Sequence, residues 1–265
     1  MKIIKKAVEM GNGAAIYIPK EYSGKEIVIL LPDGIKEIKN EILQKLIPYM
    51  NNIIGVYLYG SYARHEQTKD SDIDILIITK EKDEKIKNAL KDMDVRIITQ
   101  EGIKNAIKEY PLLVIPILKE AEVLLNPSLL EELQKEGINI KKFKWNFDEI
   151  KRAINITKKF IEIDEENISP IHIYSLMMRI RACYLIECLL KDKKFSNKGV
   201  ENKLIEQGLK KELIDDFLFI YRAVRENEEL HINIKKDNIT QLISIIKNYS
   251  KELEDEAKKK IRKRY

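Results

Sequence analysis

Cysteine, histidine and tryptophan are scarce in this chain. Its 265 residues include two cysteines, three histidines and one tryptophan. Cys183 and Cys188 lie in an apolar stretch, five residues apart, a spacing typical of neither a disulfide framework nor a metal site. We therefore expect both to be core thiols.

Long apolar runs are also missing. No run approaches the roughly 18 residues that a membrane-spanning helix needs, and the start MKIIKKAVEMGNG lacks the apolar core of a secretory signal. We expect a cytoplasmic protein without a membrane partner. The sequence also shows no repeat of 20 to 50 residues, which argues against a solenoid.

Neither sign of charge is in large excess. Forty-eight Lys and Arg residues against 43 Asp and Glu residues give a net charge of +5, which does not by itself predict nucleic-acid binding. Basic residues gather in KKKIRKR at 258–264. A solvated helix end and a contact with nucleic acid both remain open for this segment.

The first 34 residues read as a short β unit. KIIKKAVEM, AAIYIP and EIVILL have strand character, and Gly-Asn-Gly at 11–13 predicts a turn. Such a unit is too short to bury a core alone. The segment GNGAAIYIPKEYSGKEIVILL resembles SpoVT/AbrB-like proteins, whose two chains form one barrel that often binds DNA. This resemblance implies a homodimer through residues 1–34, and an ordinary hairpin appendage is the alternative.

Residues 35–144 predict an α/β sheet domain. A helical pattern at 36–50 is followed by a buried strand, IIGVYLYG, and then by a second strand, DIDILIIT. A Lys/Glu-rich helix at 81–91 leads to a third strand, MDVRIIT at 93–99. The domain should close near Asn126 and Pro127.

From 145 to 265 the strand signals stop. Apolar residues recur at helical spacing over 146–163, 170–191, 198–207, 210–226 and 237–261. These stretches predict an all-α bundle with a basic tail. The expected fold class is α+β, with a short β unit, a sheet domain and a helical bundle in that order.

The segment GSYARHEQTKDSDID at 60–74 carries the clearest chemical signal. Gly60 allows a close approach of the backbone to a triphosphate, and Ser61 and nearby amides can donate hydrogen bonds to it. Asp72 and Asp74 alternate on an extended chain, so their carboxylates should share one face. Two such carboxylates repel each other unless a cation lies between them, and Mg²⁺ or Mn²⁺ suits these oxygen ligands.

A two-metal site usually needs a third carboxylate on a neighbouring strand. Asp94 opens the third expected strand and is our candidate, with Asp92 as the fallback. Arg64 either contacts phosphate or forms a structural salt bridge.

The sequence GSYARHEQTKDSDIDILI resembles the DNA polymerase β nucleotidyltransferase superfamily, in particular its minimal nucleotidyltransferase branch, with GSxARG followed by SDxDL. The resemblance implies a nucleotide-binding set of Gly60, Ser61, Arg64 and Ser71, metal binding by Asp72, Asp74 and Asp94, and a catalytic role for these three carboxylates. His65 stands where the family usually has glycine.

The helical half contains an arginine and a histidine with five residues between them, Arg225 and His231. An imidazole can act as acid or base, and a guanidinium can stabilise negative charge during RNA cleavage. Residues 146–254 resemble the HEPN family, whose active nucleases carry R-x4-6-H. Glu226 and Asn233 depart from the family pattern. A working nuclease and a structural or nucleotide-sensing bundle both remain open.

Together these features predict a metal-dependent nucleotidyltransferase that moves AMP from ATP to a hydroxyl. By analogy with minimal nucleotidyltransferases that modify HEPN partners, the acceptor would be a protein. Two alternatives are a fused toxin–antitoxin-like module with an RNase half, and a nucleotide-sensing regulator that binds DNA. The sequence does not specify the acceptor, because surfaces outside the carboxylate motif select it.

Overall fold

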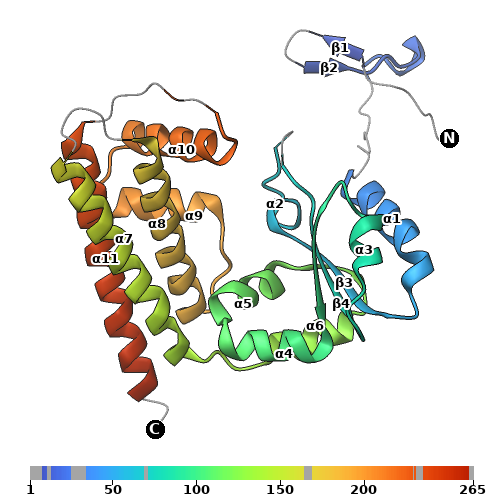
Figure 1. Ribbon diagram of the computed structural model, residues 1–265. Coiled ribbons are helices and arrows are strands. Elements are labelled where there is room, and N and C mark those ends of the chain that lie inside the picture. Colours follow the sequence, from blue (N-terminus) through green and yellow to red (C-terminus); the bar gives the residue numbers. More distant parts are fainter. Residues whose placement is uncertain are drawn as a thin grey trace. The chain divides into compact units, whose positions relative to one another are not determined.

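A computed structural model describes residues 8–10, 13–24, 34–68, 71–163, 169–228, 230 and 235–262. The chain divides into two compact units, residues 1–38 and 39–265 (Figure 1).

The first unit contains a small hairpin. Strands β1 (Val8–Met10) and β2 (Gly13–Ala15) pair antiparallel, with Val8 opposite Ala15. A 3₁₀ turn, η1 (Lys20–Tyr22), follows, and helix α1 (Gly34–Leu46) begins in this unit. The expected strand EIVILL lies outside the described residues. The AbrB-like arrangement and the homodimer therefore remain predictions.

The second unit is built on a four-stranded sheet. Its strands are β3 (Ile53–Tyr59), β4 (Asp74–Thr79), β5 (Asp94–Thr99) and β6 (Glu122–Leu125), in the order β5-β4-β3-β6. β3 runs antiparallel to β4 and β6, whereas β4 and β5 are parallel. The β-branched stretches that predicted three strands form β3, β4 and β5. The sequence analysis did not anticipate β6.

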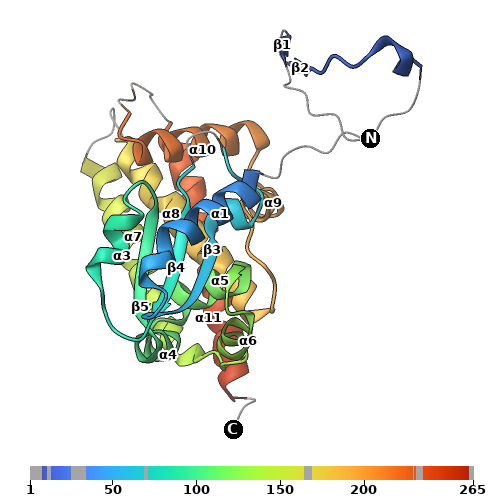
Figure 2. The same cartoon turned by 90° about the vertical axis from the view of Figure 1, so that its right-hand side faces the viewer.

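Helices cover both faces of this sheet. Ile42 of α1 and Ile86 of α3 (Glu84–Ala89) are fully buried, and these helices lie on one side of the sheet (Figures 1 and 2). Helices α4 (Gln100–Glu109), α5 (Pro111–Glu120) and α6 (Pro127–Gln134) follow β5 and β6. Helix α5 contacts both β3 and the helical half, so it bridges the sheet and the bundle.

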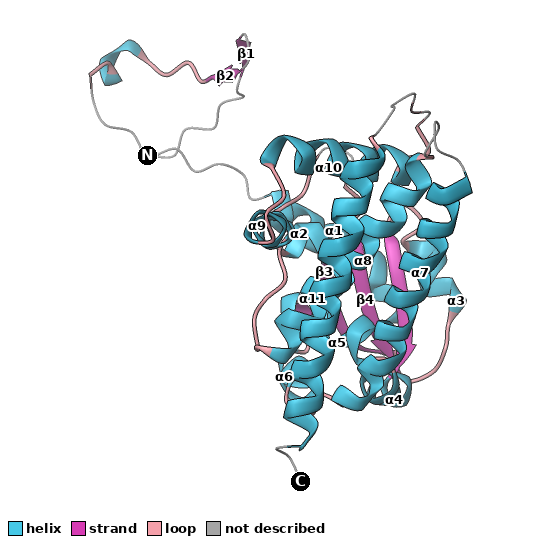
Figure 3. Ribbon diagram, turned by 90° about the vertical axis from the view of Figure 1, so that its left-hand side faces the viewer, coloured by secondary structure: helices cyan, strands magenta, loops and turns pink. Residues whose placement is uncertain are grey.

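In the rest of the described chain the regular elements are helices (Figure 3). Its elements are η3 (Ile140–Lys142), α7 (Phe143–Ile163), α8 (Pro170–Leu190), α9 (Asn197–Glu206), α10 (Lys211–Arg225) and α11 (Lys236–Arg262). In the sheet domain, a further 3₁₀ turn, η2 (Ile47–Tyr49), follows α1. One hydrophobic core runs from the sheet into the bundle. This arrangement confirms the expected fold class, a sheet domain followed by an all-α bundle.

Glu187 of α8 is a charged side chain buried within the bundle. Its carboxylate pairs with Lys191 at 2.9 Å and with Lys203 at 3.1 Å, and it accepts a hydrogen bond from the Tyr249 hydroxyl. This cluster ties α8, α9 and α11 together. Both cysteines are buried, and burial raises the pKa of Cys183 to about 12. Within the part of the chain that the structure describes, no helix is long and apolar enough to cross a membrane.

Candidate active site

The chain turns sharply between β3 and the short helix α2 (Gly60–Ala63). Gly60 has a φ of +74°, and a Cβ atom placed on it would lie 1.9 Å from Oδ2 of Asp74. Tyr59, the residue before it, is the register partner of Asp74. Only glycine lets the turn pass this close to the Asp74 carboxylate.

The sheet register brings two of the predicted carboxylates together. In the parallel pair β4–β5, Asp74 is the register partner of Asp94, so both side chains leave the sheet on the same face. Asp72 precedes β4 by two residues, and its side chain is 71% exposed. Asp92 lies in the turn before β5, without a register partner in β4. This placement favours Asp94 over Asp92 as the third carboxylate.

Asp74 is the electrostatic centre of this group. Burial, followed by the negative charges of Asp94 and Asp72, raises the pKa of Asp74 to about 6, while Arg96 and Arg64 act in the opposite direction. A cation beside these oxygens would favour the ionised form.

The donor set suits a magnesium or manganese ion that arrives with its nucleotide. Among the described residues, no three acidic, histidine or cysteine side chains converge on one metal position by themselves. Mg²⁺ is commonly held by one or two carboxylates together with substrate phosphates. The crowded oxygen ligands around Asp74 fit this mode of binding.

Two carboxylates already engage the expected phosphate-binding turn. Oε1 of Glu120 accepts a hydrogen bond from the Gly60 amide at 2.9 Å, and Oε2 accepts one from Nη1 of Arg64 at 2.8 Å. Nε of Arg64 donates to Glu66 at 3.0 Å. Burial opposes the charge of Arg64, but Glu120 and Glu66 outweigh it, and the pKa of the guanidinium is raised. Arg64 therefore forms the salt bridge that the sequence analysis left open.

Ser61 and Ser71 lie at the two ends of the motif. The Ser61 carbonyl accepts a hydrogen bond from the Glu66 amide at 2.9 Å, which closes the turn. The Ser71 hydroxyl accepts one from the Thr68 amide at 2.8 Å, so it shapes the loop before β4. Their binding of a nucleotide remains a prediction.

His65 takes a left-handed backbone conformation, with a φ of 55°. Glycine adopts this conformation without strain and histidine tolerates it, which explains why either residue fits at this position. The His65 side chain is 69% exposed, and its Nε2 lies 3.5 Å from Oε1 of Glu122 on β6.

The helical half reaches the carboxylate motif through Arg225. Nη2 of Arg225, at the end of α10, lies 3.8 Å from Oδ2 of Asp72. His231 lies outside the described residues, so its predicted pairing with Arg225 in an RNase site remains a prediction. Sequence reasoning missed Glu66, which lies between the glycine-serine turn and the aspartates of the motif, and Glu120, which is 60 residues from Gly60.

Two solved structures share distant likeness with the chain. The crystal structure of spectinomycin adenyltransferase from Enterococcus faecialis with ATP and spectinomycin is 17% identical, with a TM-score of 0.49, over 82% of this chain and 99% of that one. A toxin–antitoxin crystal structure with AMP-PNP is 19% identical, with a TM-score of 0.27, over 46% of this chain and 98% of that one.

Sequence comparisons concern the sheet domain. A protein of Methanocaldococcus jannaschii that carries the provisional name of a protein adenylyltransferase is 29% identical over 108 residues, which are 40% of this chain and 94% of that protein. Residues 40–130 match the family described as Polymerase beta, Nucleotidyltransferase. This part of the chain, with Gly60, Asp74 and Asp94, is therefore a nucleotidyltransferase domain of the polymerase beta family.

Proposed function

We propose that the protein is a metal-dependent nucleotidyltransferase that transfers AMP from ATP to a hydroxyl group on a protein. The observation that carries this proposal is the register of Asp74 with Asp94 beside the Gly60 turn. It supplies neighbouring carboxylates next to a turn that passes close to one of them, inside a segment that matches a nucleotidyltransferase family.

The chain's own residues suggest how the reaction proceeds. The acceptor hydroxyl attacks the α-phosphorus of ATP, the bond to the bridging oxygen of the β-phosphate breaks, and pyrophosphate leaves. Asp94 is exposed and takes the proton from the hydroxyl, while Asp72 and Asp74 would hold the metal ion. When bound, Mg²⁺ supplies positive charge for the attacking and leaving oxygens.

The protein acceptor rests on the relative from Methanocaldococcus jannaschii, whose provisional name is that of a protein adenylyltransferase. ATP as the nucleotide rests on the same name. The surface that selects the acceptor lies outside the carboxylate motif.

Labelled ATP tests this proposal. The full chain is incubated with Mg²⁺ and ATP carrying a labelled α-phosphate, alone and with candidate protein acceptors. We expect label on protein with the unmodified chain and none with Asp74→Asn. Asp216→Asn is the matched control, because Asp216 is an exposed residue of α10, in the helical half. The proposal fails if no label is transferred, or if Asp74→Asn transfers as much as the control.

The RNase and DNA-binding alternatives remain predictions from the sequence. His231 and the expected strand EIVILL lie outside the described residues. The described contact of Arg225 is with Asp72 of the nucleotidyltransferase motif, which favours a role for Arg225 near the transfer site.

A further inference from the structure

The helical half is hydrogen-bonded to the segment that follows the Gly60 turn. Glu66 accepts a hydrogen bond from the backbone amide of Asn197 at 3.1 Å and another from Nδ2 of Asn197 at 2.9 Å. Asn197 is the first residue of α9, where backbone amides lack partners within the helix and a negative charge is favourable. Glu66 thus joins the turn to the start of a helix in the other half.

The same chain of contacts reaches Gly60. Arg64 lies between Glu66 and Glu120, and its side chain is only 16% exposed. Glu120 then accepts a hydrogen bond from the Gly60 amide. The Gly60 turn is therefore connected to Asn197 through a continuous series of side-chain hydrogen bonds, each at 3.0 Å or less.

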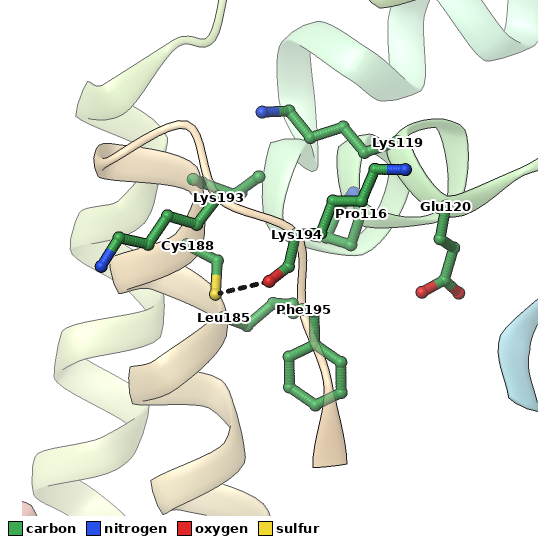
Figure 4. Close-up of a pocket in the computed structure, with 9 residues that line it drawn as sticks. Pro116, Lys119, Glu120, Leu185, Cys188, Lys193, Lys194 and Phe195 are labelled. Carbon is green, nitrogen blue, oxygen red and sulfur yellow. Dashed lines mark hydrogen bonds between the residues drawn. The ribbon is translucent and has the colours of Figure 1, made fainter. Parts of the chain in front are cut away.

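A third contact orients Asn197 from α8. Nη1 of Arg181 donates to Oδ1 of Asn197 at 2.7 Å. The Phe195 ring lies 5.2 Å from the guanidinium carbon of Arg181 and 5.6 Å from that of Arg64. Figure 4 shows Phe195 before α9 and Glu120 at the end of α5, where both line a small pocket between the two halves.

Arg181 is an unusual choice for such a position. Burial, together with the positive charges of Arg64 and Arg225, lowers the pKa of this guanidinium, whereas the Glu66 carboxylate acts in the opposite direction. The guanidinium also lies over the rings of Phe195 and Tyr221. A charge that has lost much of its contact with water is costly. The hydrogen bond from Arg181 holds the side chain of Asn197, which in turn donates to Glu66 beside the Gly60 turn.

We propose that Asn197 and Arg181 are positioning residues for nucleotidyl transfer, and that the helical half holds the Gly60 turn in its nucleotide-binding conformation through Glu66, Arg64 and Glu120. This inference rests on the proposed function for its catalytic consequence. Its structural core, the coupling of Asn197 to the Gly60 amide, can be measured without any reaction.

The test compares Asn197→Ala with Asn202→Ala in the full chain. Asn202 lies in the same helix and is exposed, so its replacement controls for effects on α9. Hydrogen exchange of the Gly60 amide is measured by NMR in the free protein. We expect exchange roughly tenfold faster in Asn197→Ala, because a hydrogen bond to a charged group is removed, and no change in Asn202→Ala. Equal exchange in the two variants overturns the inference.

Binding of ATP with Mg²⁺ is then measured on the same proteins. We expect Asn197→Ala to weaken binding roughly tenfold and the control to leave it unchanged. If the unmodified chain binds no ATP, the proposed function fails, while the exchange result still decides the coupling. If exchange changes but ATP affinity does not, the positioning role is wrong. Should Asn197→Ala lose its cooperative melting transition, Arg181→Met replaces it under the same criteria.

Discussion

Replacement of Gly60 by alanine tests whether the turn exists to admit the Asp74 carboxylate. This change has two costs, a positive φ of +74° for a residue with a side chain and a Cβ atom 1.9 Å from Oδ2 of Asp74. Gly208 offers a matched control, since its φ is +86° and a Cβ there would meet nothing within 4 Å. Gly208→Ala therefore isolates the backbone cost, about 1–2 kcal/mol.

Gly60→Ala carries the same backbone cost and must also displace the Asp74 side chain. A rotamer distorted by about 30° costs about 0.5–1.5 kcal/mol, so the total loss should reach about 2–3 kcal/mol. For a unit of this size, each kcal/mol lowers the melting temperature by roughly 2–4 °C. Because the displaced group is a proposed metal ligand, AMP transfer should fall by about 10² or more.

Thermal unfolding and transfer of labelled AMP are measured for both variants, for Asp74→Ala and for Gly60→Ala/Asp74→Ala. Removing the carboxylate removes the closest clash, so the double variant should recover roughly 0.5–1.5 kcal/mol relative to the additive expectation. Activity should not return. The reasoning is refuted if Gly60→Ala has the same melting temperature as Gly208→Ala and retains AMP transfer. It is also refuted if adding Asp74→Ala to Gly60→Ala restores no stability.

Three further predictions concern titration and the carboxylates. Burial and then the Asp94 charge raise the pKa of Asp74 to about 6 in the free protein. Stability measured without metal should therefore fall as pH rises from the unfolded-state pKa of about 3.9 towards 6, and Mg²⁺ binding should weaken as pH falls through about 6. An Mg²⁺ affinity that stays the same from about pH 5 to about pH 7 would contradict this account. Asp94→Asn should lower the transfer rate about 10²–10⁴-fold and Asp92→Asn should leave it nearly unchanged, whereas equal losses would remove Asp94 from its role. Burial opposes ionisation of Glu187, but hydrogen bonds from Tyr249 and two lysines lower its pKa to about 2; its stabilisation should therefore be present at neutral pH and disappear as pH falls from 4.5 towards 2. Glu187→Ala should cost about 3 kcal/mol in chemical denaturation at pH 7, and a loss that is equally large at pH 2.5 would count against this account.

The sequence predicted the elements whose signals are local. IIGVYLY and DILIIT are β-branched and apolar, and they form the two central strands of the sheet. The periodic apolar stretches after residue 145 form α7 to α11 with small changes at their ends. Asp94 could be paired with Asp74 in advance because each begins a strand, and neighbouring parallel strands place such residues side by side.

Other parts had no local signal. Helix α5 contains Pro116 within the apolar stretch PLLVIPILKE, and an internal proline argues against a helix. β6 has only four residues, and its pairing with β3 depends on distant contacts. The contact of Glu120 with Gly60 could not be predicted for the same reason, because Glu120 reaches Gly60 only when α5 ends beside β3. The sequence contains the residue, but its role depends on tertiary structure.

Arg225 has a described partner that its sequence motif did not predict. The spacing to His231 is local and suggested an RNase pair, whereas the described partner of the guanidinium is Asp72, in the nucleotidyltransferase motif. Both side chains are mostly exposed, at 61% and 71%, so water screens the pair and it adds little to stability. Its significance is positional, because it places the end of α10 beside the carboxylates that would hold the metal. Together with the hydrogen bonds between Asn197 and Glu66, this contact joins the helical half to the proposed transfer site at two separate points, at Asp72 and at Glu66. An independent RNase module would not need either contact, whereas a transferase whose turn is held from the helical half needs at least one.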